Sequence, residues 1–312
     1  MNNLHYNDFI DCFKDYDDIT TRLYRLHITS ADEINAFCEE IKNKLLNNSE
    51  EHLRDHLKEI ISNAEKQNNR YWLYYLILKQ KLFNESFRND FSSHYNEPLQ
   101  SIIDDDVNLF IPFTERENFN YLKLANFDFI PCVIEKLNIF ELCCYYGSVN
   151  CFKFLRTKFS AEITKKCLLL SFLGGNPEIM STCLKYQKPD DECMEYAIMS
   201  HNVDFVTFLM NEYKIPIDVE DCIKYNNIQA FFIHFDGTNN INEFVEKICY
   251  FPSLWEKVLS ILPNFIDNKS QALVRAAKKL QPKNIITSIM MEMRKMNTEK
   301  FFCIILQNVF IE

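Results

Sequence analysis

A short segment recurs along the second half of the chain at intervals that restrict its possible folds. Aligned copies begin at Gly147, Gly175, His201 and Asn226, and weaker copies begin at Phe251 and Gln281. The successive spacings are 28, 26, 25, 25 and 30 residues. A period of this size is typical of a stacked array of small units and not of a fold closed around a single core.

Positions at fixed distances from this marker residue form two helical faces. The residue seven places before the marker is apolar in every copy: Phe140, Leu168, Met194, Val219, Phe244 and Val274. The residue four places before it is small in five of the six copies: Cys143, Ser171, Ala197, Cys222, Lys247 and Ala277. Apolar positions after the marker follow a second helical face, so each unit is predicted to be two short helices. The marker lies at their turn, where a left-handed backbone favours glycine and admits Asn or His at some cost.

Two of these copies resemble a known repeat. The segments FELCCYYGSVNCFKFL (140–155) and CMEYAIMSHNVDFVTFLM (193–210) are similar to the ankyrin pattern L-x-x-A-A-x-x-G-x-x-x-I-V-x-x-L-L. The chain also resembles, over most of its length, the divergent ankyrin-repeat proteins expanded in some protists, which carry an N-terminal helical region of unknown function. FTERENF (113–119), ELCCYYGSVNCFKFLRTKF (141–159) and LSFLGGNPEIM (170–180) carry this second likeness.

The resemblance implies an all-α fold, an ankyrin-like helix-pair solenoid with a helical N-terminal region that serves as a protein-interaction scaffold. Two departures from the family pattern bear on the loops. The Thr-Pro-Leu-His start of a typical unit is absent, and the period is about 5–8 residues shorter than the usual 33. The hairpin loops between units are therefore expected to be clipped.

Four regions are expected along the chain. Residues 1–56 would form an N-terminal helical cap, and residues 138–296 the ankyrin-like repeats. Residues 57–137 would be helical, either as degenerate repeats or as a separate module. Residues 297–312, which are strongly apolar, would form a C-terminal cap.

Local signals place several elements in the first third of the chain. The sequence SADE from Ser30 to Glu33 matches a capping box and predicts a helix that continues to about Leu46. Two more helices are expected at about 49–66 and 70–87. The segment DVNLFIPF mirrors SVNCFKFL, which makes Asp105 a further turn marker.

Charge and cysteine usage exclude several classes of protein. The formal net charge is −10 and no basic cluster occurs, so the chain is a poor candidate for binding nucleic acid or an anionic membrane. The start of the chain lacks a signal-peptide pattern, and the longest apolar run, 71–78, is far short of the ~20 residues of a membrane helix. A cytoplasmic protein without membrane insertion is expected. Its twelve cysteines, among them Cys143, Cys183 and Cys222, are then expected to be reduced and mostly buried.

Two clusters have metal-ligand residue types. His52 and His56 lie four residues apart on one helix face, a spacing that zinc can use, but Leu53 replaces the glutamate of the metalloprotease motif. Two exposed histidines are the favoured interpretation. The run from Asp104 to Asp106 lacks the glycine and closing glutamate of a calcium loop, so a solvated turn or a helix N-cap is favoured there.

Two further pairs have simple structural interpretations. Cys143 and Cys144 are expected to pack in the core in preference to any redox role. Gly174 and Gly175 lack the additional glycine or Lys-Ser/Thr of a phosphate loop and fit the turn between helices. No catalytic, cofactor-binding or metal-binding residue is assigned.

The leading hypothesis is a non-enzymatic scaffold that binds another protein through its concave face. A degenerate structural or self-associating regulatory module is one alternative, and an enzyme with an unrecognised site in the N-terminal helices is another. The predicted contact surface lies at offsets −5, −2 and −1 from the markers, where apolar and aromatic residues predominate on a face that resemblance to ankyrin makes concave. Its nine residues are Leu142, Tyr145, Tyr146, Leu170, Leu173, Tyr196, Met199, Lys224 and Tyr225. The other expectation for this face is that the chain's own loops or N-terminal helices cover it.

Overall fold

The regular elements of this protein are helices. The structure, a computed structural model, describes residues 6–28, 30–46, 51–68, 72–85, 97–122, 136–238, 241–248 and 250–251. No β-strand occurs in these ranges, which establishes an all-α fold for the described part. The chain divides into two compact units. The central unit contains Thr21–Cys38 and Ile61–Asp221, and the terminal unit contains Met1–Thr20, Glu39–Ile60 and Cys222–Glu312.

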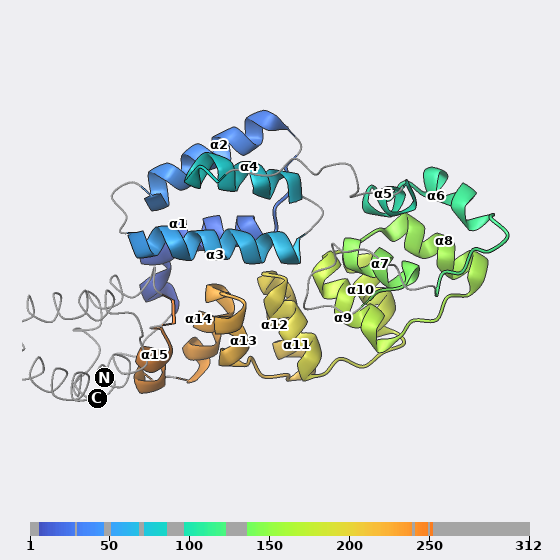
Figure 1. The fold of residues 1–312 in the computed structure, drawn as a ribbon. Coiled ribbons are helices and arrows are strands. Elements are labelled where there is room, and N and C mark those ends of the chain that lie inside the picture. Colours follow the sequence, from blue (N-terminus) through green and yellow to red (C-terminus); the bar gives the residue numbers. More distant parts are fainter. Residues whose placement is uncertain are drawn as a thin grey trace, which may run out of the picture. The chain divides into compact units, whose positions relative to one another are not determined.

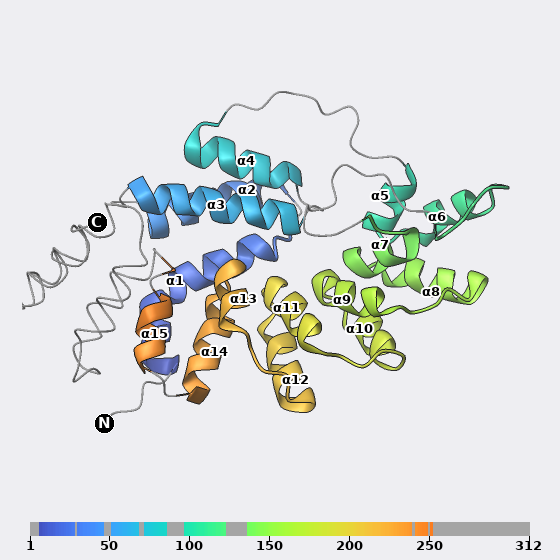
Figure 2. The ribbon, with the colours of Figure 1, turned by 60° about the horizontal axis from the view of Figure 1, so that its bottom comes forward.

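Most of the central unit consists of short helices, of which α5 to α12 follow one another in a row (Figure 1). In chain order these are α4 (Trp72–Phe83), α5 (Glu97–Ile103), α6 (Val107–Thr114), α7 (Ile139–Tyr146), α8 (Val149–Phe159), α9 (Lys165–Gly174), α10 (Pro177–Leu184), α11 (Asp191–Met199) and α12 (Val203–Tyr213). Helix α9 packs between α7 and α11, and each of these three packs on the helix that follows it, as Figure 2 shows. The connections 160–164, 185–190 and 214–218 contain no strand.

The turn residues occupy the conformation that the sequence predicts. The φ angles are 70° at Gly147, 68° at Gly175, 52° at His201, 53° at Asn226 and 53° at Asp105, all in the left-handed region. Each of these residues follows a first helix and precedes a second one. The prediction of helix pairs joined at these markers is confirmed for these five positions.

The predicted small-residue positions lie in the core. Cys143, Ala197 and Cys222 have no exposed surface, and Ser171 is 1% exposed. Small side chains here let neighbouring helices approach closely.

Replacing Ala197 by leucine should therefore overpack the helix pair and lower the free energy of unfolding by about 1–3 kcal/mol. Denaturant melts of the whole chain, with the exposed Asn211→Leu variant on α12 as control, measure the difference. A neutral result at Ala197 would contradict the packing described here.

The acidic cluster caps helices. The Asp106 carboxylate accepts hydrogen bonds from the amides of Asn108 and Leu109 at the start of α6, at 3.0 and 3.1 Å. The Asp105 carboxylate accepts from the amides of Asn150 and Cys151 at the start of α8, at 2.9 and 3.0 Å. The side chain of Ser148, the N-cap residue of α8, accepts no hydrogen bond from the first amides of this helix. The Asp105 carboxylate accepts those hydrogen bonds in its place. The favoured interpretation of this cluster, a turn and N-cap, is confirmed.

The N-terminal helices largely follow the predictions. The Ser30 hydroxyl accepts a hydrogen bond from the amide of Glu33 at 3.2 Å and opens α2 (Ala31–Ile41), which continues as a π-helical segment, Lys42–Leu46. Helices α3 (Glu51–Gln67) and α4 match the next two expected helices. Helix α1 (Tyr6–Tyr24) had no specific prediction. The expected C-terminal cap at 297–312 and the copies beyond Phe251 lie outside the described residues.

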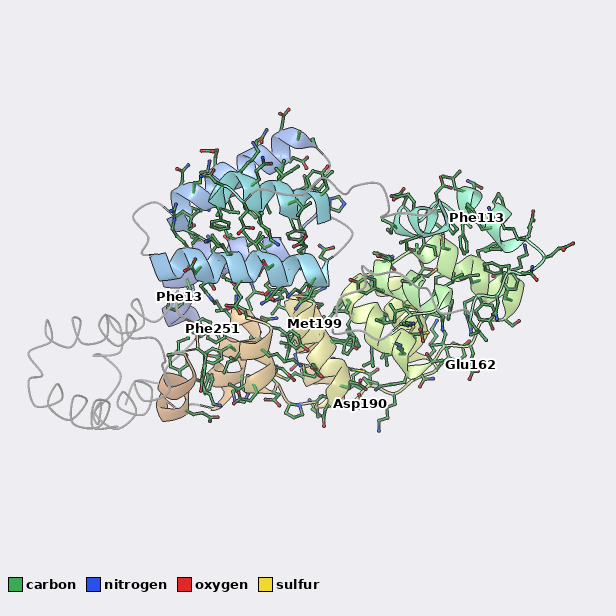
Figure 3. All side chains as sticks on the ribbon, in the orientation of Figure 1. Phe13, Phe113, Glu162, Asp190, Met199 and Phe251 are labelled. Atoms are coloured by element: carbon green, nitrogen blue, oxygen red, sulfur yellow. The ribbon has the colours of Figure 1, made fainter. Side chains whose placement is uncertain are left out.

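The terminal unit has an aromatic core. Its helices include α14 (Ile228–Thr238), α15 (Ile241–Ile248) and the first part of α1. The ring of Phe231 lies 4.9 Å from that of Phe251 and 5.7 Å from that of Phe244, measured between centroids. Phe13 of α1 stacks on Phe232 at 5.6 Å, which attaches α1 to α14. Figure 3 labels Phe13 and Phe251.

The described residues bear on two expectations, that the chain has no membrane helix and that its cysteines are mostly buried. Within the described ranges, every helix is too short or too polar to cross a membrane. Cys143, Cys183 and Cys222 are fully buried, as predicted. Burial raises the pKa of the Cys143 thiol, so that thiol stays protonated and unreactive.

Candidate binding pocket

The predicted contact face is partly buried. Five of its nine residues are at most 5% exposed: Leu142, Tyr145, Leu170, Met199 and Tyr225. Tyr146, Leu173 and Tyr196 are half-buried, and Lys224 is exposed. In the terminal unit, the Lys224 ammonium lies 4.7 Å from the centre of the Tyr225 ring. The buried residues cannot contact a partner protein as the chain is folded here.

Segments from the first third of the chain cover part of this face within the central unit. The Tyr145 hydroxyl donates a hydrogen bond to the backbone carbonyl of Gln67 at 2.9 Å. The Tyr24 ring stacks on the His201 ring with 3.7 Å between centroids. The end of α1 and the end of α3 therefore pack on the helix array. This arrangement agrees with the expectation that the chain's own N-terminal helices cover the face.

The cover is incomplete and leaves a pocket of about 310 Å³. Its lining lies entirely in the central unit: Tyr24, Arg25, Leu26, His27, Gln67, Asn68, Tyr145, Tyr146, Leu173, Gly174, Gly175, Met199, Ser200 and Asn202. Four of the nine predicted contact residues are among these, and Met199, at the end of α11, is labelled in Figure 3. The volume lies at the small end of the range of ligand pockets, which is suited to one side chain of a partner.

Five helices contribute the residues at or just after their C-terminal ends to this pocket: α1, α3, α7, α9 and α11. The last four carbonyl groups of a helix have no partner within the helix. The aligned peptide dipoles also place a partial negative charge at that end. Several of the end carbonyls already accept hydrogen bonds within the chain, among them that of Gln67 from the Tyr145 hydroxyl and that of Ala197 from the Ser200 hydroxyl.

Two glycines bring the ends of α7 and α9 together. A Cβ atom on Gly174 would overlap the carbonyl oxygen of Cys144 and lie 2.8 Å from the amide nitrogen of Gly147. Gly147 needs its left-handed backbone and is also crowded by the Gly174 carbonyl. The sequence explained the turn at Gly147 and Gly175 but not this close approach, which makes Gly174 part of the pocket wall.

Several polar groups of the lining are hydrogen-bonded inside the protein. The Ser200 hydroxyl donates to the Ala197 carbonyl at 2.8 Å, and the Gly175 amide donates to the Ser171 carbonyl at 3.2 Å. The side-chain amide of Asn68 donates to the Leu26 carbonyl at 3.1 Å. These bonds occupy both the donors and the acceptors that they join.

Arg25 is the residue of the lining that carries a formal charge at neutral pH. Arg25 and His27 are both exposed, and no carboxylate lines the pocket. Gln67 is half-buried, and its side-chain oxygen Oε1 is buried without a hydrogen-bond partner. A buried acceptor left in this state costs free energy, which a donor can recover.

The remaining candidate sites have structural roles. His56 is half-buried and its ring lies 3.2 Å from the Tyr16 hydroxyl in the terminal unit, so the expectation of an exposed histidine is wrong at this position. The His52 side chain lies outside the described residues. Cys143 and Cys144 are fully buried, and burial also raises the pKa of the Cys144 thiol. Among the described residues, no group of three His, Cys, Asp or Glu is placed to hold a metal ion.

Sequence reasoning missed the residues that come from the first third of the chain, Tyr24–His27, Gln67 and Asn68. Helix α1 carries a usable signal, because Phe13, Tyr16, Ile19 and Leu23 are buried at spacings of three and four residues. The turn after α3 lies in the region 57–137, for which degenerate repeats are one expectation. Neither pattern indicates that these segments end beside α7, α9 and α11.

One protein-family model matches about a quarter of the chain. The model of a protein family described as a domain of unknown function, DUF3447, matches residues 159–234. No ankyrin family matches. Searches of curated proteins and of solved structures find no match.

Proposed function

We propose that this chain is a non-enzymatic scaffold that binds another protein, and that its helix pairs form an ankyrin-like solenoid with clipped loops. The stacking of α7, α9 and α11, with left-handed turns at Gly147, Gly175 and His201, supports the solenoid. The strandless connections of five or six residues support the clipped loops. Stacked helix pairs leave one long face on which a partner can lie.

The observation that carries the proposal is the pocket at the C-terminal ends of these helices. It combines three tyrosines, Met199 and polar groups in a hollow the size of a side chain. Tyrosine and methionine provide large, adaptable contact areas in protein interfaces. The burial of Tyr145 and Met199 moves the expected contact away from these two side chains and toward the more accessible Tyr146 and Leu173 at the pocket.

Affinity capture from a cell lysate followed by mass spectrometry tests the proposal. The Tyr146→Asp variant should lose a protein that the unchanged chain retains, because the half-buried Tyr146 lines the pocket. Tyr213→Asp is the matched control, since Tyr213 is 37% exposed and lies outside the pocket. Both variants should melt within a few degrees of the unchanged chain. The same set of captured proteins with all three chains would overturn the proposal.

A further inference from the structure

The loop after α10 carries a tyrosine that is open to solvent. Tyr186 is 59% exposed, compared with 37% for Tyr213 and 39% for Tyr250. The loop itself is held in place, because the side-chain amide of Gln187 donates a hydrogen bond to the Ile163 carbonyl at 2.8 Å. Tyr186 therefore presents its side chain to solvent from a fixed position that lies outside the pocket.

An arginine of the preceding helix pair contacts this side chain. Nη2 of Arg156, on α8, donates a hydrogen bond to the Tyr186 hydroxyl at 3.0 Å, and the Arg156 Cζ atom lies 4.9 Å from the centre of the Tyr186 ring. Nη1 of Arg156 donates to the Ala161 carbonyl at 2.8 Å. The bond to the backbone holds the guanidinium beside the hydroxyl, while Nη2 keeps a second hydrogen that another acceptor can use.

The charge of Arg156 is not paired with a carboxylate in the part of the chain that the structure describes. Its contacts there are the Ala161 carbonyl and Tyr186. The nearest carboxylate along the sequence, that of Glu162, is exposed and forms no ion pair with it. Arg156 is half-buried, and a guanidinium in such a place commonly pairs with an acid. An anion beside the Tyr186 hydroxyl would supply the missing partner.

The loop adds further positive charge around the tyrosine. Lys185 and Lys188 are both exposed and lie within two residues of Tyr186. Asp190, the acid of this loop, is already paired with Lys165. A negative group attached to Tyr186 would therefore gain favourable interactions with its surroundings, although the whole chain has a formal net charge of −10.

We propose that Tyr186 is a site of tyrosine phosphorylation and that Arg156 binds the attached phosphate. A tyrosine kinase would transfer the γ-phosphoryl group of ATP to the phenolic oxygen. The bond from that oxygen to phosphorus forms, the bond from phosphorus to the β-phosphate oxygen breaks to release ADP, and the phenolic proton passes to solvent. This inference does not depend on the proposed function, because Tyr186 lies outside the pocket.

The modification would connect two successive helix pairs. A phosphate monoester carries a charge of about −1.5 to −2 at pH 7 and three strong acceptor oxygens. Arg156 lies on α8 and Tyr186 follows α10, and these two helices pack on each other (Figure 2). Charge-assisted hydrogen bonds from Arg156 to the phosphate would therefore strengthen the contact between neighbouring units.

The effect on stability can be measured on the full chain with phosphotyrosine incorporated in place of Tyr186. Its melting temperature should rise by about 2–4 °C, and in the Arg156→Gln background the rise should fall below about 1 °C. Phosphotyrosine in place of Tyr213 is the matched control. Tyr213 is the last residue of α12, where the helix end disfavours negative charge, so no rise is expected there. The inference is wrong if the rise is absent, if it persists in Arg156→Gln, or if it is equal at both positions.

Phosphorus NMR on the same chains tests whether Arg156 contacts the phosphate. The second pKa of a phosphate monoester is about 6, and the guanidinium should lower it by about half a unit or more at position 186. Arg156→Gln should return the pKa to its ordinary value, while the phosphate at position 213 should not respond to this substitution. A phosphate pKa at position 186 that is unchanged by Arg156→Gln would overturn the assignment of Arg156.

Kinase treatment tests whether an enzyme can reach the site. The full chain is incubated with a broad-specificity tyrosine kinase and ATP, and peptide mass spectrometry follows Tyr186 and Tyr213. Tyr186 should be modified at least about five-fold faster, because it is more exposed and lies on a loop. Equal rates at the two tyrosines, or no modification of Tyr186, would contradict the proposal.

Discussion

Replacing Gly174 by alanine is expected to lower the free energy of unfolding by about 3 kcal/mol or more. The new methyl group would overlap the carbonyl oxygen of Cys144 and lie 2.8 Å from the amide nitrogen of Gly147. Both of these atoms are backbone, so no side-chain rotation relieves the overlap. The ends of α7 and α9 would have to separate, and the pocket that they line would change shape. Urea denaturation followed by circular dichroism measures the loss.

Gly175→Ala is a matched control on the adjacent residue. A Cβ atom on Gly175 would have no heavy atom within 4 Å beyond the adjacent residues, so packing is unaffected. The residue keeps a φ of 68°, which costs an alanine about 1–2 kcal/mol. The two variants therefore separate close packing from backbone conformation. A smaller loss in Gly174→Ala than in Gly175→Ala would contradict the close approach of the two helices.

Features that depend on neighbours in sequence could be predicted. The left-handed turns at Gly147, Gly175, His201 and Asn226 follow from residue type and from the apolar spacing around them. The same spacing assigns the buried position of Ala197. These features depend only on residues within one helix pair, and every unit repeats the same short pattern.

The cover over the predicted contact face could not be predicted in the same way. An apolar residue such as Leu142 or Met199 fits a partner interface and a covered core equally well by composition. The choice between them depends on where residues more than 70 positions away are placed, as in the hydrogen bond from Tyr145 to Gln67. No periodic pattern encodes that pairing, so the pocket itself emerges only from the structure.

Asp17→Asn is expected to stabilise the terminal unit at neutral pH. Burial on α1 raises the pKa of the Asp17 carboxyl from 3.8 to about 6; a hydrogen bond from Gln229 at 2.7 Å opposes the shift, and Asp18 adds to it. Because the pKa in the folded state is above that in the unfolded state, the folded state binds more protons between these values. Stability therefore falls as pH rises from about 4 to 6, and the full cost is present above pH 6.

The size of the effect follows from the shift. About two pKa units correspond to about 3 kcal/mol, which is an upper value because Asp17 is only half-buried. Asparagine keeps an oxygen that can accept from Gln229 and carries no charge, so the Asp17→Asn variant should gain up to this amount at pH 7 and nothing at pH 3.5. Unfolding free energies of both chains across pH 3.5–8 measure the difference, with Asp191→Asn as control, because Asp191 is exposed and does not contribute to the Asp17 shift. Parallel profiles for Asp17→Asn and the unchanged chain would show that the Asp17 carboxylate is solvated, and α1 would then not bury it against α14.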